Sequence, residues 1–111
     1  MLEQTIKITA LYDFYGVLLT QRQQKCIEMH YFDDLSLAEV AEHFCTSRQA
    51  VHDILKRSVQ TMNNFEQKLR LIDKHKKEQD LLAEIDGLLA KSQTKIPELV
   101  RVREKILQLL I

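Results

Sequence analysis

A stripe of residues between Val51 and Ile72 constrains the fold of this chain more than any other feature of its sequence. Its members are separated alternately by four and three positions, and they are Val51, Leu55, Ser58, Met62, Phe65, Leu69 and Ile72. This spacing keeps all of them on one face of a single α-helix, as in the seam of a coiled coil. The stripe therefore predicts one long helix, with Ser58 as the one polar member of its seam.

Residues that break helices are scarce along the whole chain. The 111 residues include 2 glycines and 1 proline, which leaves few positions for the tight turns of an all-β fold. The chain is 45% hydrophobic and 29% charged, which is sufficient apolar content for a packed core. We therefore predict an all-α protein.

N-capping signals mark where three of the helices begin. Thr20 with Gln23 and Ser36 with Glu39 each form a capping box, in which two side chains satisfy otherwise unpaired backbone donors. Ser47 can cap the next helix, which carries the long stripe. The link between the helix that Ser36 starts and the helix that Ser47 starts is long enough only for a sharp turn. These two helices predict a helix-turn-helix motif.

Two further helices are expected before this motif. The first covers residues 3–18, and the second covers residues 21–32 and ends at the acidic pair Asp33 and Asp34. The expected core contacts are Ile6, Leu11, Phe14, Tyr15 and Leu18 on the first helix, and Cys26, Ile27 and Tyr31 on the second.

The C-terminal part contains two more amphipathic segments. The polar run DKHKKEQD, residues 73–80, is expected to end the long helix, and KSQTKI, residues 91–96, is expected to be a loop. The apolar stripes are Leu81, Leu82, Ile85, Leu88 and Leu89 in one segment, and Leu99, Val102, Ile106, Leu109 and Leu110 in the other, which Pro97 begins. Each stripe is one-sided and needs a partner surface. Either these segments pack with the long helix as a bundle, or the seam and the tail form a homodimer. The packing or dimer seam comprises Val51, Leu55, Met62, Phe65, Leu69 and Ile72.

The helix that follows Ser47 carries polar residues on the faces that its core does not need. These candidate nucleic-acid-binding residues are Arg48, Gln49, His52, Lys56 and Arg57. The second helix of a helix-turn-helix lies in the major groove of DNA, where its N-terminal residues contact base edges. Arginine can donate two hydrogen bonds to guanine, and glutamine can pair with adenine. Lys56 and Arg57 are better placed for phosphates, which orient a protein without reading sequence.

The charge balance argues against strong non-specific binding to nucleic acid. The chain has 16 basic and 16 acidic residues and a pI near 6.9. Residues 19–57 contain five basic and six acidic side chains, and Asp53 lies on the presumed reading face. Helix-turn-helix domains also serve as protein-docking modules, so both kinds of contact remain open at this point.

Other kinds of chemistry receive little support from the sequence. Cys26 and His30, with His43 and Cys45, could in principle hold zinc, but Cys26 falls on an apolar face and Cys45 in the motif's turn. We expect neither a metal nor a cofactor. The sequence contains no phosphate-cradling glycine loop, nucleophile elbow or convincing acid-base pair, so we expect no enzyme. No stretch without charge exceeds eight residues, which excludes a membrane span. Two cysteines without a disulfide pattern favour a cytoplasmic protein with reduced thiols.

Two resemblances add to this interpretation. LTQRQQKCIEMHY and LSLAEVAEHFCTSRQAVHDILKR, within residues 19–57, resemble region 4 of bacterial sigma factors, which reads the −35 promoter element. DFYGVLLTQRQ (13–23), YFDDLSLAEVAEHF (31–44) and SRQAVHD (47–53) extend a resemblance over nearly the whole chain. That second resemblance is to the YlxM-like family, small bacterial proteins encoded beside the signal recognition particle GTPases.

The resemblance implies a cytoplasmic regulatory protein of the signal recognition particle pathway. Its recognition helix would contact duplex DNA, RNA or a protein component of that pathway. The sigma-like reading residues carry over to Arg48, Gln49 and His52. Asp53 and Cys45 depart from the sigma pattern, which usually has glutamine at the first position and glycine or asparagine at the second.

The expected architecture is a sigma-region-4-like helix-turn-helix domain over residues 1–57 and a helical extension over residues 58–111. The recognition helix continues into the extension, which serves packing or dimerisation. Two alternative functions remain open, namely a sequence-specific dimeric transcriptional regulator and an adaptor that binds only protein. The mixed charges of residues 73–80 indicate a solvated helix surface more than an RNA-binding patch.

Overall fold

The computed structural model describes residues 2–91 and 97–110, and every regular element within these ranges is helical. The all-α prediction is confirmed. The elements are α1 (Leu2–Tyr15), a 3₁₀ turn (Gly16–Leu18), α2 (Gln21–Ile27), a π-helical turn (Glu28–Phe32), α3 (Leu37–His43), α4 (Arg48–Leu69), α5 (Leu71–Lys91) and α6 (Pro97–Leu110). The chain forms two compact units, Met1–Ile72 and Asp73–Ile111. The loop expected at residues 91–96 lies, apart from Lys91, outside the described residues.

The N-terminal caps lie where the sequence predicts them. Thr20 and Gln23 form the expected capping box, with backbone-to-side-chain distances of 3.0 and 3.2 Å in the two directions. Ser36 and Glu39 form the second box at the start of α3. Ser47 Oγ accepts a hydrogen bond of 3.0 Å from the backbone N–H of Ala50, so it caps α4.

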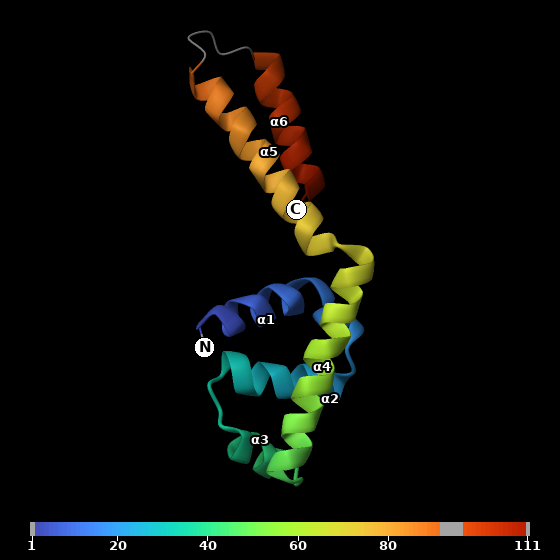
Figure 1. Ribbon diagram of the computed structural model, residues 1–111. Coiled ribbons are helices and arrows are strands. Elements are labelled where there is room, and N and C mark those ends of the chain that lie inside the picture. The colour runs from blue at the N-terminus through green and yellow to red at the C-terminus, as the bar shows by residue number, and fades with distance from the viewer. Residues whose placement is uncertain (1, 92–96, 111) are drawn as a thin grey trace. The chain divides into compact units, whose positions relative to one another are not determined.

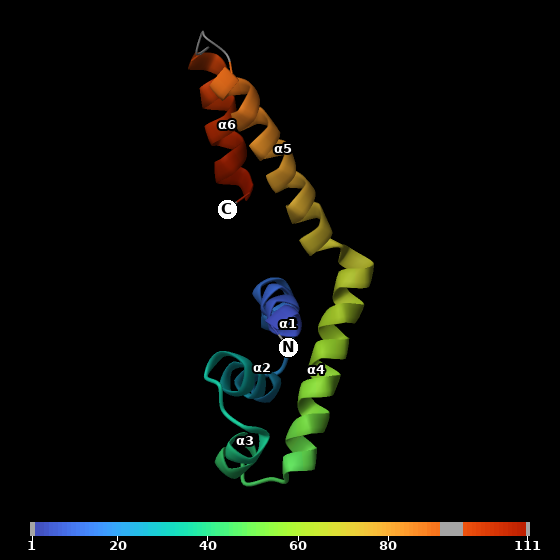
Figure 2. The same ribbon diagram turned by 60° about the vertical axis from the view of Figure 1, so that its left-hand side comes forward.

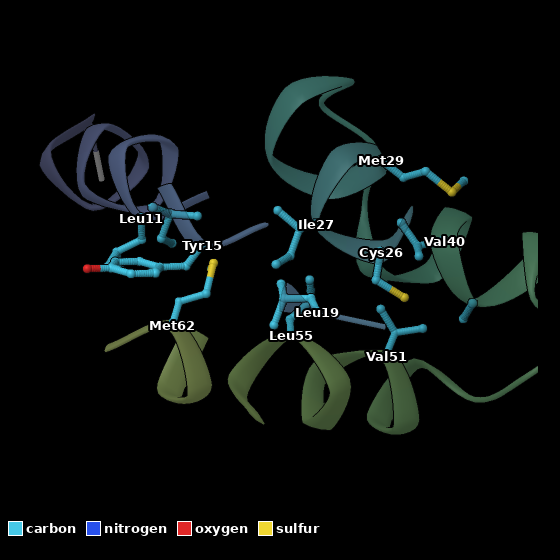
Figure 3. Packing of buried hydrophobic residues seen from close by; sticks show 12 residues of the cluster. Leu11, Tyr15, Leu19, Cys26, Ile27, Met29, Val40, Val51, Leu55 and Met62 are labelled. Atoms are coloured by element: carbon cyan, nitrogen blue, oxygen red, sulfur yellow. The ribbon is translucent and has the colours of Figure 1, made fainter. Parts of the chain in front are cut away.

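The core of the first unit lies between α4 and the three preceding helices. In Figures 1 and 2, α4 runs alongside α1, α2 and α3. Figure 3 shows Cys26, Val40 and Val51 directed toward one another at one end of this core, and Met62 directed toward Tyr15 at the other. All five side chains have no exposed surface. The helix-turn-helix thus packs in one core with α1 and α2.

The predicted stripe on α4 is buried over its first four members. Val51, Ser58 and Met62 are fully buried and Leu55 is nearly so, while Phe65 is half-buried and stacks on Tyr15 at 6.0 Å between ring centroids. The buried hydroxyl of Ser58 donates to the carbonyl of Ile54 at 2.7 Å, which satisfies the one polar member of the stripe. These side chains therefore pack within their own chain.

The long helix ends earlier than the sequence pattern indicates. Arg70 takes a left-handed conformation with φ of 54°, which terminates α4 after Leu69 and leaves the Leu69 side chain 52% exposed. The polar run at residues 73–80, where the sequence analysis expected the end, lies inside α5. The stripe continues past this break only through Ile72, the second residue of α5, which is half-buried against the core.

A hydrogen-bond network holds the break at Arg70. The buried hydroxyl of Tyr15 donates to Glu66 Oε1 at 2.6 Å and accepts from the backbone N–H of Leu71 at 3.2 Å. The same Glu66 oxygen accepts from the N–H of Ile72 at 2.9 Å. Two unpaired donors at the start of α5 are thereby satisfied by side chains of α1 and α4.

The first helix differs from its predicted register. It ends at Tyr15, and the 3₁₀ turn that follows leaves Leu18 52% exposed. Ile6 is also exposed, whereas Ile8 is buried in its place. Gly16 is needed at the end of this helix because a Cβ there would lie 2.9 Å from the ring of Tyr12. The prediction that Ile6 and Leu18 belong to the core is therefore wrong.

Three helical segments end in left-handed residues that are not glycine. Asp34, Cys45 and Arg70 have φ values of 58°, 52° and 54°. After α3, Cys45 N–H donates to the carbonyl of Glu42 at 3.2 Å and Thr46 N–H donates to that of Ala41 at 3.0 Å. This is the Schellman pattern, and its left-handed position usually holds glycine. The turn of the helix-turn-helix thus keeps its usual geometry despite a cysteine.

The second unit contains α6 and nearly all of α5, which lie side by side in Figures 1 and 2. Arg103 Nη2 donates to Asp86 Oδ2 at 2.8 Å, and this hydrogen bond lowers the pKa of Asp86. Leu82 is the one buried hydrophobic side chain that this unit shows within residues 73–91 and 97–109. The first unit extends to Ile72, beyond the domain boundary expected at residue 57, because α4 packs against α1 as far as Phe65.

Replacing Cys45 with asparagine should stabilise the protein. A left-handed conformation costs a residue with a Cβ about 1–2 kcal/mol, and asparagine tolerates it better than other such residues. Because Cys45 is exposed, no core packing is lost. We expect Cys45→Asn to raise the free energy of unfolding by about 1 kcal/mol in urea denaturation. Cys45→Ala, which keeps the strained Cβ, is the control, and an equal gain from it would contradict the explanation.

The tyrosines should make the fold sensitive to alkaline pH. Burial and a hydrogen bond to Glu28 at 2.9 Å raise the pKa of Tyr12 to about 12, and burial also raises the pKa of Tyr15 and Tyr31. A raised pKa in the folded state stabilises it below the unfolded value of about 10, and this stabilisation is lost as the pH rises toward 12. Tyrosinate absorbance should therefore appear together with loss of helical circular dichroism. Ordinary titration near pH 10 of an intact fold would oppose this.

Candidate nucleic-acid interface

The helix α4 presents two different faces. One carries the buried stripe that begins with Val51 and Leu55, and the other carries polar side chains that are exposed. All five candidate residues lie on exposed positions of α4, and they are Arg48, Gln49, His52, Lys56 and Arg57. Because the stripe is anchored in the core, rotation of α4 about its axis is fixed. The polar face is therefore held toward solvent.

The start of α4 is shaped by its cap and by the turn before it. Ser47 caps the helix at Ala50, and the Schellman turn at Cys45 brings the chain sharply from α3 into α4. Arg48 is consequently the first residue of the helix and Gln49 the second. The N-terminal turn of the presumed recognition helix is exposed, and in a helix-turn-helix this turn contacts base edges.

A groove of about 360 Å³ brings three of the candidate residues together. Its lining residues are Arg48, Gln49 and His52 from α4, with Leu37 from the start of α3. The three polar side chains supply donors and acceptors, and Leu37 supplies an apolar surface beside them. Such a set can meet the edge of a base pair, including the methyl group of thymine.

A second groove, of about 300 Å³, extends along the same face. It is lined by His52 and Lys56 together with residues of α1 and the π-helical turn, among them Gln4 and Tyr31. His52 belongs to both grooves, so the two form a continuous surface. Arg57 lines neither groove, since it lies about 100° around the helix axis from Lys56.

Asp53 interacts with two of the candidate residues. Its Oδ1 accepts a hydrogen bond of 3.1 Å from Gln49 Nε2 and lies 3.7 Å from His52 Nδ1. The Gln49 amide has two N–H groups, so one N–H and the carbonyl remain available for a ligand. Asp53 thus orients Gln49 while placing a negative charge on the same face.

Two residues that were not among the candidates belong to this surface or adjoin it. Leu37 lines the first groove, and its position one residue after the Ser36 cap could have indicated this. Arg22, exposed on α2, lies over the ring of Phe44 at 5.7 Å from its guanidinium carbon to the ring centroid. A cation–π contact orients the guanidinium beside α3. No pattern in the sequence predicts a contact between Arg22 and Phe44.

The residues considered for zinc have other environments. Cys26 is buried in the core, where burial raises the pKa of its thiol, and Cys45 is exposed in the turn. His30 Nδ1 lies 2.8 Å from the carbonyl oxygen of Leu35. In the described part of the chain, no three or more His, Cys, Asp or Glu side chains are grouped as metal ligands. The described helices also include none with the length and apolarity needed to cross a membrane.

The short α3, the sharp turn and the capped α4 with an exposed polar face define a helix-turn-helix protein. A family model described as "Putative helix-turn-helix protein, YlxM / p13 like" (UPF0122) matches residues 2–102. The chain belongs to this family. It is 53% identical over 83 residues to a UPF0122 protein of Desulforamulus reducens, covering 75% of this chain and 71% of the relative. It is 42% identical over 106 residues to UPF0122 proteins of Bacillus mycoides and Bacillus anthracis, covering 96% of each chain.

Proposed function

We propose that this protein is a regulatory helix-turn-helix protein whose α4 face contacts nucleic acid, with duplex DNA as the first ligand to test. One observation carries the proposal, namely the groove that brings together Arg48, Gln49 and His52 at the N-terminal end of α4. These side chains are exposed, and the buried stripe fixes their direction. The reading end of the recognition helix is therefore pre-organised for the major groove of DNA.

Each of the five candidate residues on α4 has a side chain suited to a particular contact with DNA. Arg48 would donate two hydrogen bonds to a guanine, and Gln49 would use its free N–H and carbonyl toward an adenine. His52 lies between them and Lys56 and can contact either a base or a phosphate. Lys56 and Arg57 would bind phosphates and set the orientation of α4. These contacts together would give the protein a regulatory role.

The charges of this face favour weak non-specific binding to nucleic acid. On the exposed face, Arg48, Lys56 and Arg57 are opposed by Asp53, and the whole chain has no net charge. Non-specific binding, which depends on phosphate neutralisation, should therefore be weak. Specific contacts at the groove would supply most of the discrimination.

The pathway is inferred from the resemblance to YlxM-like proteins. We propose that the protein acts in the cytoplasm as a regulator of the signal recognition particle pathway. The same α4 face would then contact a nucleic-acid or protein component of that pathway. An RNA ligand would use the same cationic side chains, whereas a protein ligand would depend less on Lys56 and Arg57.

Fluorescence anisotropy with a pool of genomic duplex DNA tests the proposal. We expect binding at about 50 mM salt that falls steeply by about 200 mM, since several phosphate contacts release counterions. Lys56→Ala should weaken binding to all sequences alike. It should also reduce the slope of the logarithm of affinity against the logarithm of salt concentration by about 1. Arg48→Ala should instead lower the preference for a selected sequence, with a loss of about 1–3 kcal/mol at one base pair.

The same titration with signal recognition particle RNA and its GTPase distinguishes the alternatives. If DNA fails to bind at either salt concentration while the particle binds saturably, the DNA proposal is wrong. Binding to RNA that Lys56→Ala weakens would indicate an RNA-docking face. Binding to the GTPase that survives Lys56→Ala and Arg57→Ala would indicate an adaptor that docks only on protein.

Asp53→Asn should strengthen nucleic-acid binding. The asparagine side chain can still accept the hydrogen bond from Gln49, but the negative charge near the phosphates is removed. We expect about five-fold tighter binding to duplex DNA, which corresponds to about 1 kcal/mol of relieved repulsion. Glu98→Gln on α6 changes the net charge equally and serves as the control. Equal gains from both variants would mean that net charge, and not the α4 face, determines affinity.

A further inference from the structure

The second unit leaves much of its apolar surface uncovered. Within the described residues of Asp73–Ile111, Leu82 is its one buried hydrophobic side chain. Large apolar side chains that are about half or more exposed are Leu81 (60%), Leu88 (66%), Leu99 (49%), Val102 (53%) and Leu109 (86%). A unit of roughly 40 residues usually requires a disulfide, a metal or a partner for stability. The sequence of this unit contains no cysteine and so offers no disulfide, whereas its exposed apolar side chains offer a surface for a partner.

These exposed side chains gather on one side of the two helices. Leu88 from α5 and Leu99 and Val102 from α6 line a common hollow of about 260 Å³, with Ile85 and Ile106 also lining it. Leu81 lies one heptad before Leu88. Leu109 lies one heptad after Val102. Residues seven apart occupy nearly the same face of a helix, so each helix carries a ridge of apolar side chains beside the hollow.

Each helix therefore has an apolar face too broad for a two-helix hairpin. On α5, Leu82 and Leu89 are more buried than Leu81 and Leu88, although all four belong to one apolar stripe. The more buried row packs within the hairpin, and the exposed row remains. A face of this width is typical of helices in four-helix bundles, where each helix contacts two neighbours.

We propose that the face formed by Leu81, Leu88, Leu99, Val102 and Leu109 is the contact surface for a second copy of this chain. Two α5–α6 hairpins would close it into an antiparallel four-helix bundle. The exposed ridge of one copy would fill the hollow of the other. The first four members of the α4 stripe have no part in this contact, because they are occupied in the core of the first unit.

The charges around this face suit a second copy better than a charged partner. The described residues 73–91 and 97–110 carry seven basic and seven acidic side chains, so two identical hairpins do not repel each other by net charge. Both helices carry acidic and basic side chains, and Asp86 already pairs with Arg103, which lines the hollow. Mixed charges at the flanks of an apolar face provide the self-complementary rim that a two-fold contact requires.

The available area is sufficient for a specific dimer. The five exposed side chains, with the partly exposed Ile85, Leu89 and Ile106, present on the order of 500 Å² of apolar surface in each copy. Two copies would then bury about 1,000 Å², at the lower end of specific protein interfaces. We therefore expect a dimer that dissociates at low concentration.

Sedimentation equilibrium of the full chain from about 1 to about 100 μM tests this proposal. The wild-type protein should be a dimer at the upper end, and Leu88→Glu should weaken the dimer at least about 100-fold. Ala90→Glu is the matched control, because it introduces the same charge at a position that is exposed on the polar side of the same helix. It should leave the dimer unchanged. A wild-type protein that is monomeric throughout, or a Leu88→Glu variant that remains dimeric, overturns the proposal.

A second measurement does not depend on any variant. Because dimerisation stabilises the folded state by mass action, the melting temperature of the wild-type helices should rise with protein concentration. A melting temperature that is independent of concentration would contradict the dimer.

Circular dichroism of Leu88→Glu serves as a control for the sedimentation experiment. It should show that the helices of this variant persist, as expected for a side chain that is 66% exposed. Neither measurement uses nucleic acid, so this proposal can fail or succeed independently of the proposed DNA contact.

Discussion

The rotation of α4 about its axis is the constraint on which the rest of the structure depends. The fully buried Val51, Ser58 and Met62 lie on one face, and turning the helix would expose this face and bury charged groups. Burying an unpaired charge costs far more than the apolar contacts supply, so only one rotation is allowed. The same constraint directs Arg48 and Lys56 outward. Core packing and the candidate reading face are thus two consequences of one helical pattern.

Tyr15 connects this core to the end of α4. Its ring is fully buried and stacks on Phe65, while its hydroxyl bridges Glu66 and the backbone of Leu71. A buried hydroxyl without partners would be destabilising, so the network compensates for burying the tyrosine. It also supplies partners for the first donors of α5. The break at Arg70 is therefore fixed by contacts from α1, distant in sequence, as much as by its own backbone conformation.

These contacts explain which parts of the structure could be predicted from the sequence. The helix starts were predictable because Thr20, Ser36 and Ser47 act through neighbours three residues away. The end of α4 was not, because Arg70 takes a left-handed conformation that sequence patterns associate with glycine. Exposure of the candidate site followed from helical periodicity. The contacts of Asp53 with Gln49 and His52 were not apparent from residue types alone, although the spacing of these residues on α4 permits them. The position of Leu37 in the wall of the groove depends in addition on how the turn places α3 against α4.

The two proposals constrain each other when they are combined. A dimer formed through α5 and α6 would carry two recognition helices, and paired helix-turn-helix motifs read half-sites about 34 Å apart. A dimer with that spacing would read a palindromic DNA site through Arg48 and Gln49 of both copies. A dimer with another spacing would favour a protein or RNA ligand over a palindromic DNA site.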